Sequence, residues 1–284
     1  MQIVTTSSQL QQALQKVRAH HNTIGLVPTM GNLHAGHMAL VGAAVSDCDF
    51  ALATIFVNPL QFGASEDLSA YPRTPDEDIH LLQEAGCELL FTPSIAEIYP
   101  DGLERHTRVH VPALTDEFCG ASRPGHFDGV TTVVAKLFNL TQPDRAYFGL
   151  KDFQQFLVIR KMVKDLAMDI QLTGIETVRE PSGLAMSSRN NYLTAAQRLQ
   201  AASIYQTLLA TAASIQAGDT DYPELERNAA MQLAGDNSML DYFAIRDADN
   251  LQTPCPETAE LVILTAVRIG PTRLIDNIRI ASPR

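Results

Sequence analysis

The sequence is poor in cysteine, and its four cysteines lie far apart. Cys48, Cys87, Cys119 and Cys255 form no Cys-x-x-Cys pair. A structural zinc site usually draws on such pairs, so none is expected. Widely spaced cysteines are typical of reduced thiols in the cytoplasm, which predicts a cytoplasmic protein without disulfides.

Long apolar runs are also missing. No segment approaches the roughly 20 residues that a membrane-spanning helix needs. The first residues, MQIVTT, show no basic stretch followed by an apolar one. We therefore expect neither a membrane span nor a secretory signal.

Basic residues are scarce, with 21 Lys and Arg against 32 Asp and Glu and a net charge of −11. A large nucleic-acid interface normally needs clustered Lys and Arg, so no nucleic-acid partner is expected. An acidic protein that binds a phosphate-rich ligand must gather its few positive groups locally. Besides helix N-termini, the candidates are His34, His37, Arg123, Lys151 and Arg189.

The 284 residues are enough for two domains, and the hydrophobic fraction of 45% is that of a globular protein. Short apolar strands alternate with helices through residues 1–175, which predicts an α/β domain with a doubly wound, Rossmann-like parallel sheet. Residues 176–284 predict a smaller α+β domain of helices followed by strands. The expected strands are 2–4, 24–27, 50–57, 88–91, 107–111, 145–148, 169–173, 177–178, 240–246, 259–269 and 273–280.

The most informative stretch is VPTMGNLHAGH, residues 27–37. It joins an apolar strand to an alanine-rich helix through a turn that contains Gly31 and Gly36. The first amides of a helix have no acceptor within the helix, so such a turn is a natural anion site. His34 and His37 are three residues apart and can share one face. The pattern favours a polyphosphate ligand; the alternative is an ordinary loop that happens to contain two histidines.

A second strand-turn-helix segment carries a lysine. Gly149, Leu150, Lys151 and Asp152 follow a predicted strand, and Asp152 is placed to cap the next helix. Lys151 is either a phosphate contact or a surface lysine. Gln155 lies in the first turn of that helix, and Gln61 follows the strand at 50–57. Because ligands of open α/β sheets bind beyond the carboxyl ends of strands, we expect both glutamines to face one crevice.

Three further segments have side chains suited to an anionic ligand. The glycine-rich stretch 120–130 carries Arg123, and the loop 181–191 combines serines with Arg189, donors that suit phosphate oxygens. His126 is a ligand contact or a structural residue. Asp78, in the first turn of a helix that begins at Pro75, either complements the helix dipole or helps to hold Mg²⁺ near the phosphates.

Seven strings, in order, resemble the pantothenate synthetase family, within the His-x-Gly-His nucleotidyltransferase-like Rossmann superfamily. They are residues 28–37, 55–62, 71–74, 122–127, 148–155, 186–190 and 245–248. The resemblance implies a ligase that condenses (R)-pantoate with β-alanine, using ATP and Mg²⁺, through a pantoyl adenylate. It also implies a cytoplasmic homodimer.

The resemblance also implies roles for individual residues. His34, His37, Lys151 and Arg189 match catalytic positions, and Gln61, Gln155, Arg123 and Tyr71 match positions that contact the substrates. The implied ATP site comprises Met30, Gly31, Asn32, Leu33, His34, Ala35, Gly36, His37, Gly149, Leu150, Lys151, Asp152, Val178, Met186, Ser187, Ser188 and Arg189. Leu150 is a departure, because many relatives carry Glu there.

Two other functions share parts of this pattern. A nucleotidyltransferase that moves AMP or CMP onto a phosphorylated acceptor has the same His-x-Gly-His turn, but it predicts more basic residues for the acceptor phosphate. A synthetase-like tRNA-binding module predicts a basic face, against which the acidic balance argues.

Overall fold

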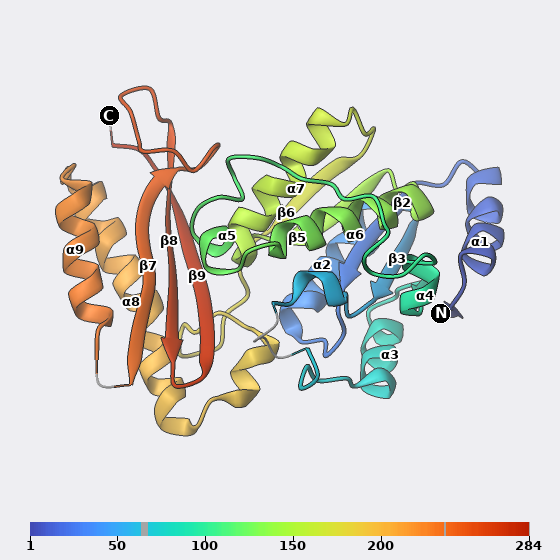
Figure 1. The fold of residues 1–284 in the computed structure, drawn as a ribbon, viewed down its shortest axis with the longest axis horizontal. Helices are drawn as coiled ribbons and strands as arrows, with labels where there is room; N and C mark the ends of the chain where they lie inside the picture. Colours follow the sequence, from blue (N-terminus) through green and yellow to red (C-terminus); the bar gives the residue numbers. More distant parts are fainter. Residues whose placement is uncertain (64–67, 236, 284) are drawn as a thin grey trace.

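The computed structural model describes residues 1–63, 68–235 and 237–283. Six strands form one sheet in the order β1-β4-β3-β2-β5-β6, and every pair in it is parallel (Figure 1). Its strands are β1 (Gln2–Val4), β2 (Ile24–Thr29), β3 (Phe50–Ile55), β4 (Leu89–Phe91), β5 (Arg145–Gly149) and β6 (Gln171–Ile175).

Helices cover both faces of this sheet. The α-helices before its last strand are α1 (Ser7–Ala19), α2 (Ala35–Asp47), α3 (Pro75–Glu84), α4 (Ile95–Ile98), α5 (Cys119–Ser122), α6 (His126–Thr141) and α7 (Phe153–Asp165). Leu26 and Leu52 pack on the face of α1, α6 and α7, whereas Val27, Ala51 and Ala53 pack on the face of α2 and α3. Strands buried on both faces explain the nearly continuous apolar runs. The predicted doubly wound α/β fold is confirmed.

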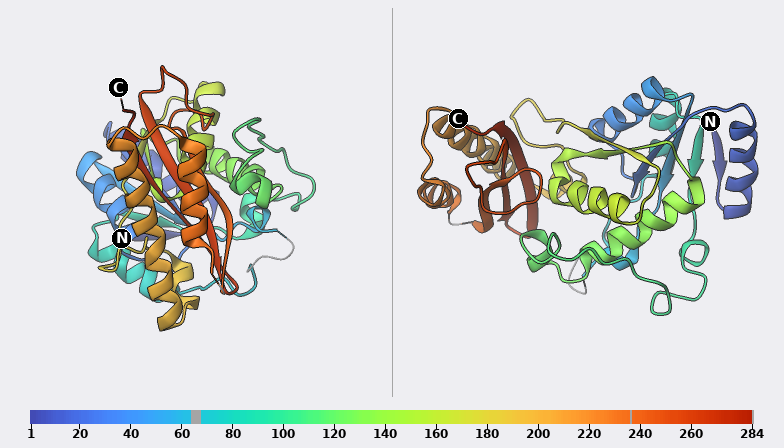
Figure 2. Two further views of the ribbon diagram at one scale, coloured as in Figure 1. Left: turned by 90° about the vertical axis from the view of Figure 1, so that its left-hand side faces the viewer. Right: turned by 90° about the horizontal axis from the view of Figure 1, so that it is seen from above.

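The C-terminal part is built on an antiparallel sheet in the order β7-β8-β9. Its elements are α8 (Ala195–Gln216), α9 (Tyr222–Leu233), β7 (Ser238–Asp247), β8 (Glu260–Ile269) and β9 (Thr272–Ala281). Helices α8 and α9 cover the outer face of this sheet (Figures 1 and 2). Each sheet falls on one side of the boundary expected near residue 175, but the division into two domains stays a prediction.

The inner face of the small sheet packs against the parallel-sheet part. Leu150, Phe153 and Leu157 form one apolar cluster with residues of β7 and β8, including Ala244 and Leu264. This cluster lies directly beside the loop that carries Lys151. The packing of the second sheet therefore bears on the predicted anion site.

The strands expected at 107–111 and 177–178 are wrong. These residues lie outside both sheets. The backbone N–H of Val109 donates to the Thr132 hydroxyl over 3.0 Å, and the Thr131 hydroxyl donates to the Val109 carbonyl over 2.5 Å. Two threonines of α6 thus supply the partners that a neighbouring strand would provide, which is why an alternating, β-branched segment runs along a helix. Within the described residues, no helix is both long and apolar enough to cross a bilayer.

Candidate active site

The two predicted anion-binding turns lie side by side. Strand β2 pairs with β3 on one side and β5 on the other, so the strand order reverses there, and ligands bind at such a switch point. Residues 30–37 follow the end of β2, and the short 3₁₀ helix η2 (Leu150–Asp152) follows the end of β5. Because the strands are parallel neighbours, both turns meet at one edge of the sheet.

His34 and His37 cap helix α2 with their own side chains. The Gly36 N–H donates to Nδ1 of His34 over 3.1 Å, and the His34 N–H donates to Nδ1 of His37 over 3.3 Å. The ring centroids are 4.1 Å apart. Because Nδ1 is the acceptor in both rings, Nε2–H is left as the donor in both. A Cβ at Gly36 would lie 2.9 Å from Cε1 of His34, so this cap needs glycine there.

Both imidazoles are neutral at physiological pH. Burial, followed by the charge of Lys151, lowers the pKa of His34 to about 4. Burial, followed by the neighbouring His34, lowers the pKa of His37 to about 3. His34 and His37 are among the positive groups expected from the sequence, and for the protein without ligand that expectation is wrong. They are neutral hydrogen-bond donors instead.

Asp78 holds the turn that leads to these histidines. Its side chain is buried, and its two oxygens accept from the backbone N–H groups of Asn32 (2.9 Å) and Leu33 (2.7 Å). Asn32 has a positive φ of 50°, a conformation that needs such support. Neither expected role for Asp78 includes these contacts. Its contact with magnesium stays a prediction.

A cavity of about 390 Å³ opens beside η2. The predicted residues that line it are Arg123, Lys151, Asp152, Gln155, Ser187 and Arg189. Burial raises the pKa of the Asp152 carboxyl, but Lys151 and Arg189 outweigh burial and the pKa is lowered. Asp152 therefore stays ionised and partly offsets the two cations. It precedes α7 without capping it through its side chain, contrary to the expectation.

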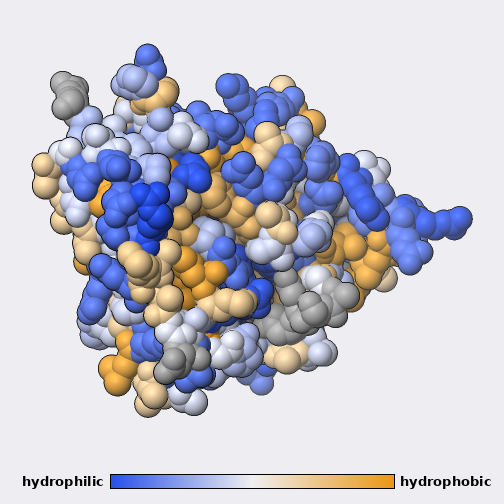
Figure 3. All heavy atoms as spheres, turned by 60° about the vertical axis from the view of Figure 1, so that its left-hand side comes forward, coloured by the Kyte–Doolittle hydropathy of each residue, from blue (hydrophilic) through white to orange (hydrophobic). Residues whose placement is uncertain are grey.

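A second cavity, of about 300 Å³, adjoins residues 30–37, the histidine turn. Its lining includes Asn32, Leu33, His34, Met186, Ser187 and Ser188. Ser187 lines both cavities, and the Ser188 hydroxyl donates to the Asn32 carbonyl over 3.2 Å. The loop at residues 181–191, the serine loop, therefore adjoins both the histidine turn and the cavity beside η2. The face drawn in Figure 3 is hollowed near its middle, where apolar residues gather among hydrophilic ones.

Gln61 and Tyr71 are not among the residues that line these cavities. The Gln61 side chain lies against Sδ of Met30 (2.8 Å), and its backbone carbonyl accepts from Nδ1 of His126 (2.7 Å). The Tyr71 ring is buried edge-on against Phe62. Gln61 thus joins the histidine turn to the start of α6, which places it beside the site.

Leu150 and Val178, both expected in the ATP site, line neither of the two cavities. The Leu150 side chain is buried in the apolar cluster below β7 and β8, and a Cβ at Gly174 would meet it at 2.5 Å. An apolar residue at 150 therefore matches its surroundings. The Val178 carbonyl accepts from the Met186 N–H over 2.9 Å, which anchors the start of the serine loop.

Sequence reasoning missed several residues of the C-terminal sheet. Asp276 pairs with Arg179 (2.6 Å), and the Asn277 amide donates to the carbonyls of Leu150 and Lys151, both over 2.9 Å. The available signal was two adjacent polar residues between the apolar Leu274, Ile275 and Ile278 of one strand. Cys119, Tyr242 and Arg273 also line the larger cavity, and their spacing in the sequence gave no hint of it.

Comparisons with known proteins agree with this geometry. The family model for pantoate-beta-alanine ligase matches residues 2–279. The pantothenate synthetase of Pseudomonas savastanoi pv. phaseolicola is 52% identical over 99% of both chains, and that of Chromohalobacter salexigens is 51% identical over 97% of both.

Solved structures give the same result. The pantothenate synthetase of Thermus thermophilus matches with a TM-score of 0.91 at 46% identity, covering 98% of this chain and 99% of that one. A pantoate-beta-alanine ligase from Francisella tularensis, complexed with beta-gamma ATP and beta-alanine, matches with a TM-score of 0.78 at 34% identity, covering 98% and 97%. The chain belongs to the pantoate–β-alanine ligase family.

Proposed function

We propose that this protein joins (R)-pantoate to β-alanine in two steps driven by ATP. A pantoate carboxylate oxygen attacks the α-phosphorus and pyrophosphate leaves, giving pantoyl adenylate. The β-alanine amine then attacks the acyl carbon and AMP leaves. The observation that carries the proposal is the meeting of two helix-opening turns, with Lys151 and Arg189 beside them, at the switch point of the sheet. The solved relative from Francisella tularensis, complexed with beta-gamma ATP and beta-alanine, supports it.

The residues around the two turns suit a triphosphate. Lys151 and Arg189 supply fixed positive charge where adenylation builds negative charge on the phosphates. The Nε2–H groups of His34 and His37 add neutral donors that need no counter-ion. Once a polyanion binds, it favours protonation of these rings, and a proton on His37 would then be available to the leaving group.

The acid and the amine have separate proposed partners. Gln155 lines the larger cavity beside Lys151, and a carboxamide both donates and accepts, which suits a hydroxy acid. Gln61, whose side chain contacts Met30 beside the histidine turn, is the second proposed partner of the acid. Arg123 is the proposed contact for the β-alanine carboxylate. Tyr71, whose ring packs against Phe62, is proposed to border the substrate site. The serine loop, from Met186 to Arg189, shields the adenylate from water.

Magnesium fits this site as a partner of the nucleotide. When bound, the ion neutralises phosphate charge. Among residues 1–63, 68–235 and 237–283, no three His, Cys, Asp or Glu side chains gather as a metal cluster. Mg²⁺ commonly uses one or two carboxylates together with substrate phosphates and water, so the phosphates supply most of its ligands. Asp78, whose oxygens already hold the Asn32 and Leu33 amides, is the proposed protein contact.

A direct assay tests the activity. The protein is incubated with ATP, Mg²⁺, pantoate and β-alanine, and AMP and pantothenate are quantified by chromatography. We expect both products, in equal amounts and dependent on β-alanine. A stable dinucleotide, or transfer of AMP or CMP to a phosphorylated acceptor, would instead identify the alternative nucleotidyltransferase. A gel shift with tRNA at moderate salt tests the third function, and no shift is expected.

We further propose a cytoplasmic homodimer. All four cysteines are free thiols in the structure, which suits a reducing compartment. Sedimentation equilibrium would give twice the chain mass of 31.0 kDa, and a monomer at micromolar concentration would contradict the dimer.

A further inference from the structure

An irregularity in the small sheet directs Asp241 toward two arginines. The register of β7 against β8 shifts between Leu240 and Tyr242, which leaves Asp241 as the extra residue of a β-bulge. Bulges redirect a side chain and occur often beside active sites. Here the Asp241 carboxylate accepts from Nε of Arg273 over 2.6 Å and from Nε of Arg268 over 3.3 Å.

The two arginines face each other across neighbouring strands. Arg268 on β8 is the direct register partner of Arg273 on β9. Like charges placed opposite each other destabilise a sheet pair. Asp241 compensates for this repulsion, and its ion pair with Arg273 is nearly buried, with side-chain exposures of 12% and 13%. The chain therefore maintains an otherwise unfavourable arginine pair beside the larger cavity.

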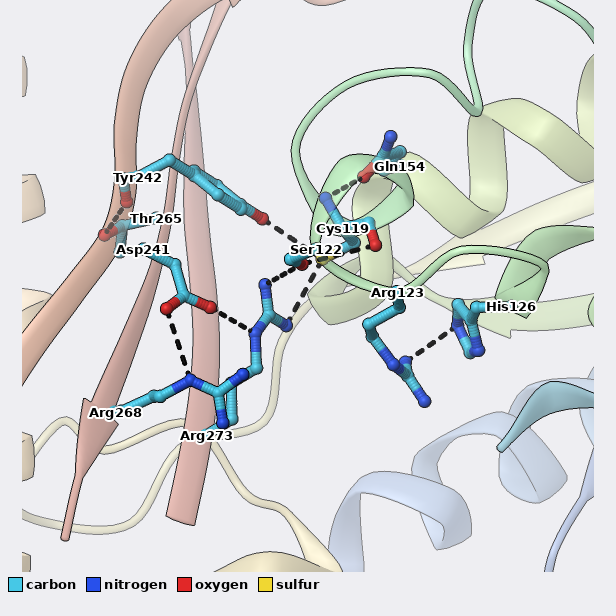
Figure 4. A network of polar contacts seen from close by, with 10 residues as sticks. All are labelled: Cys119, Ser122, Arg123, His126, Gln154, Asp241, Tyr242, Thr265, Arg268 and Arg273. Atoms are coloured by element: carbon cyan, nitrogen blue, oxygen red, sulfur yellow. Dashed lines mark hydrogen bonds and ion pairs between the residues drawn. The ribbon is translucent and has the colours of Figure 1, made fainter. Parts of the chain in front are cut away.

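Arg273 reaches from the small sheet to helix α5, as Figure 4 shows. Its Nη1 donates to Sγ of Cys119 over 3.4 Å, and its Nη2 donates to the Ser122 hydroxyl over 3.1 Å. The Tyr242 hydroxyl lies 3.2 Å from the same sulfur. One guanidinium, held at Nε by Asp241, thus contacts the first and the last residue of α5.

Helix α5 is also held from the opposite side. The Cys119 N–H donates to the Gln154 carboxamide oxygen over 3.0 Å, and the Gln154 amide donates to the carbonyls of Leu114 and Glu117. A Cβ at Gly120 would come within 1.9 Å of the Thr115 carbonyl oxygen, so α5 has no room to shift that way. Contacts with Gln154 and Arg273 on its two sides fix this four-residue helix.

The residue that follows α5 is Arg123, its C-cap. Its guanidinium lies 2.8 Å from Nε2 of His126 and donates to the Gln61 carbonyl over 3.3 Å, and it lines the larger cavity. A displacement of α5 is passed directly to Arg123, because Ser122 and Arg123 are consecutive. Misplacing a substrate-contacting group by about 1 Å can cost on the order of a hundredfold in rate.

We propose that Arg273 is a positioning residue: held by Asp241, it fixes α5 through Cys119 and Ser122 and so places Arg123 toward the amine substrate. The inference rests on the proposed function, in which Arg123 serves the second step. Arg273 then acts through Arg123 rather than on the substrate itself. The small sheet, distant in sequence from α5, thereby takes part in the use of β-alanine.

A double-mutant cycle tests this directly. Arg273→Met, Arg123→Ala and the double variant are assayed for pyrophosphate release without β-alanine and for pantothenate formation with it. We expect Arg273→Met to reduce kcat/KM for β-alanine about tenfold or more, with pyrophosphate release within about twofold of wild type. In the Arg123→Ala background, Arg273→Met should have little further effect. Equal losses in both backgrounds would overturn the proposal and indicate direct contact with substrate or a merely structural role.

Two further variants separate position from stability. Arg273→Lys keeps a cation beside Asp241 but cannot reach Cys119 and Ser122 together, so it should unfold like wild type yet share the β-alanine defect. Normal use of β-alanine by Arg273→Lys would also overturn the proposal. Arg160→Met is the control: Arg160 joins α7 to Asp249, beyond the end of β7, without contacting α5, and its loss should leave both steps unchanged.

If the wild-type enzyme makes no pantothenate, the proposed function fails; an additive cycle in an active enzyme rejects only the positioning role.

Discussion

The side-chain amide of Asn277 donates a hydrogen bond to the backbone carbonyl of Lys151 over 2.9 Å. The same amide also donates to the Leu150 carbonyl over 2.9 Å. A strand near the C-terminus thus holds the loop that carries the proposed phosphate contact, 126 residues earlier in the chain. The position of Lys151 therefore depends on the packing of the small sheet.

Replacing Asn277 by Ala should loosen this loop. Two buried carbonyls lose their donors, so the free energy of unfolding should fall by about 1–3 kcal/mol, and pyrophosphate release should slow about tenfold. Denaturant unfolding and a coupled pyrophosphate assay measure the two effects. Asn250→Ala, in the exposed turn after β7, is the control and should change neither. A variant with wild-type adenylation would contradict the link between Asn277 and Lys151.

Lys151→Ala should slow adenylate formation much more than it weakens pantoate binding. The ammonium group lies in the larger cavity, where it stabilises charge that builds up in the first step. Loss of one such preorganised donor typically costs about a hundredfold or more in rate. Rapid-quench kinetics measure the first step, and calorimetric titration measures pantoate binding. Lys161→Ala, on the exposed side of helix α7 and paired with Asp165, should be unchanged. An intact first step would refute the role of Lys151.

Adjacent glutamines on α7 should behave differently when changed. Gln155 lines the cavity, so Gln155→Ala should raise the KM for pantoate about tenfold, equivalent to one or two lost hydrogen bonds. Gln154 also borders the cavity, but its carboxamide is bound to the segment from Leu114 to Cys119, so Gln154→Ala should lower the melting temperature and leave the KM for pantoate unchanged. Steady-state kinetics and thermal unfolding of both variants distinguish them. Unchanged pantoate kinetics in Gln155→Ala would count against its assignment.

These cases show which parts of the site the sequence could predict. The histidine turn and the loop at Lys151 are local patterns, because strand, glycine turn and helix follow one another within a short segment. The contacts of Arg273 with Cys119 span 154 residues, and those of Asn277 with Lys151 span 126. No periodicity encodes such pairs. They depend on how the small sheet packs against the parallel one.

The charge state and the hydrogen-bond partners of buried side chains could not be predicted from the sequence either. His34 and His37 were counted as positive because the sequence shows residue types and not their burial. Asp78 was assigned as a dipole partner or a metal ligand because its helical position was visible, whereas the amides of Asn32 and Leu33 became its partners only through the fold. The strand wrongly expected at 107–111 also reflects partners that only the fold supplies. Its residues alternate as in a strand, but the hydroxyls of Thr131 and Thr132 are hydrogen-bonded to the backbone of Val109.

The buried position of Leu150 leads to a fourth prediction. Its side chain packs with the apolar side chains of Ala244, Val262 and Leu264, so Leu150→Glu would bury a carboxylate among apolar groups. We expect a loss of about 2–4 kcal/mol in the free energy of unfolding, similar to or larger than that of Leu150→Ala. Chemical denaturation of both variants at neutral pH measures this. If Leu150→Glu were as stable as the parent, the assigned packing of this side chain would be wrong.

The neutral histidines give the last prediction, which concerns pH. The pKa of His34 is about 4 and that of His37 about 3 in the folded protein, both below the ordinary 6.5. Between these values and pH 6.5 the unfolded chain binds more protons, so the free energy of unfolding falls as the pH drops below 6.5 and is unaffected by these rings above it. His37→Asn should remove about 1–2 kcal/mol of the difference in unfolding free energy between pH 7.5 and pH 5.0. Guanidinium unfolding at the two pH values measures this, and NMR titration follows the imidazole resonances directly. Resonances of His34 and His37 that titrate with a midpoint near 6.5 would show that neither ring is held neutral by burial.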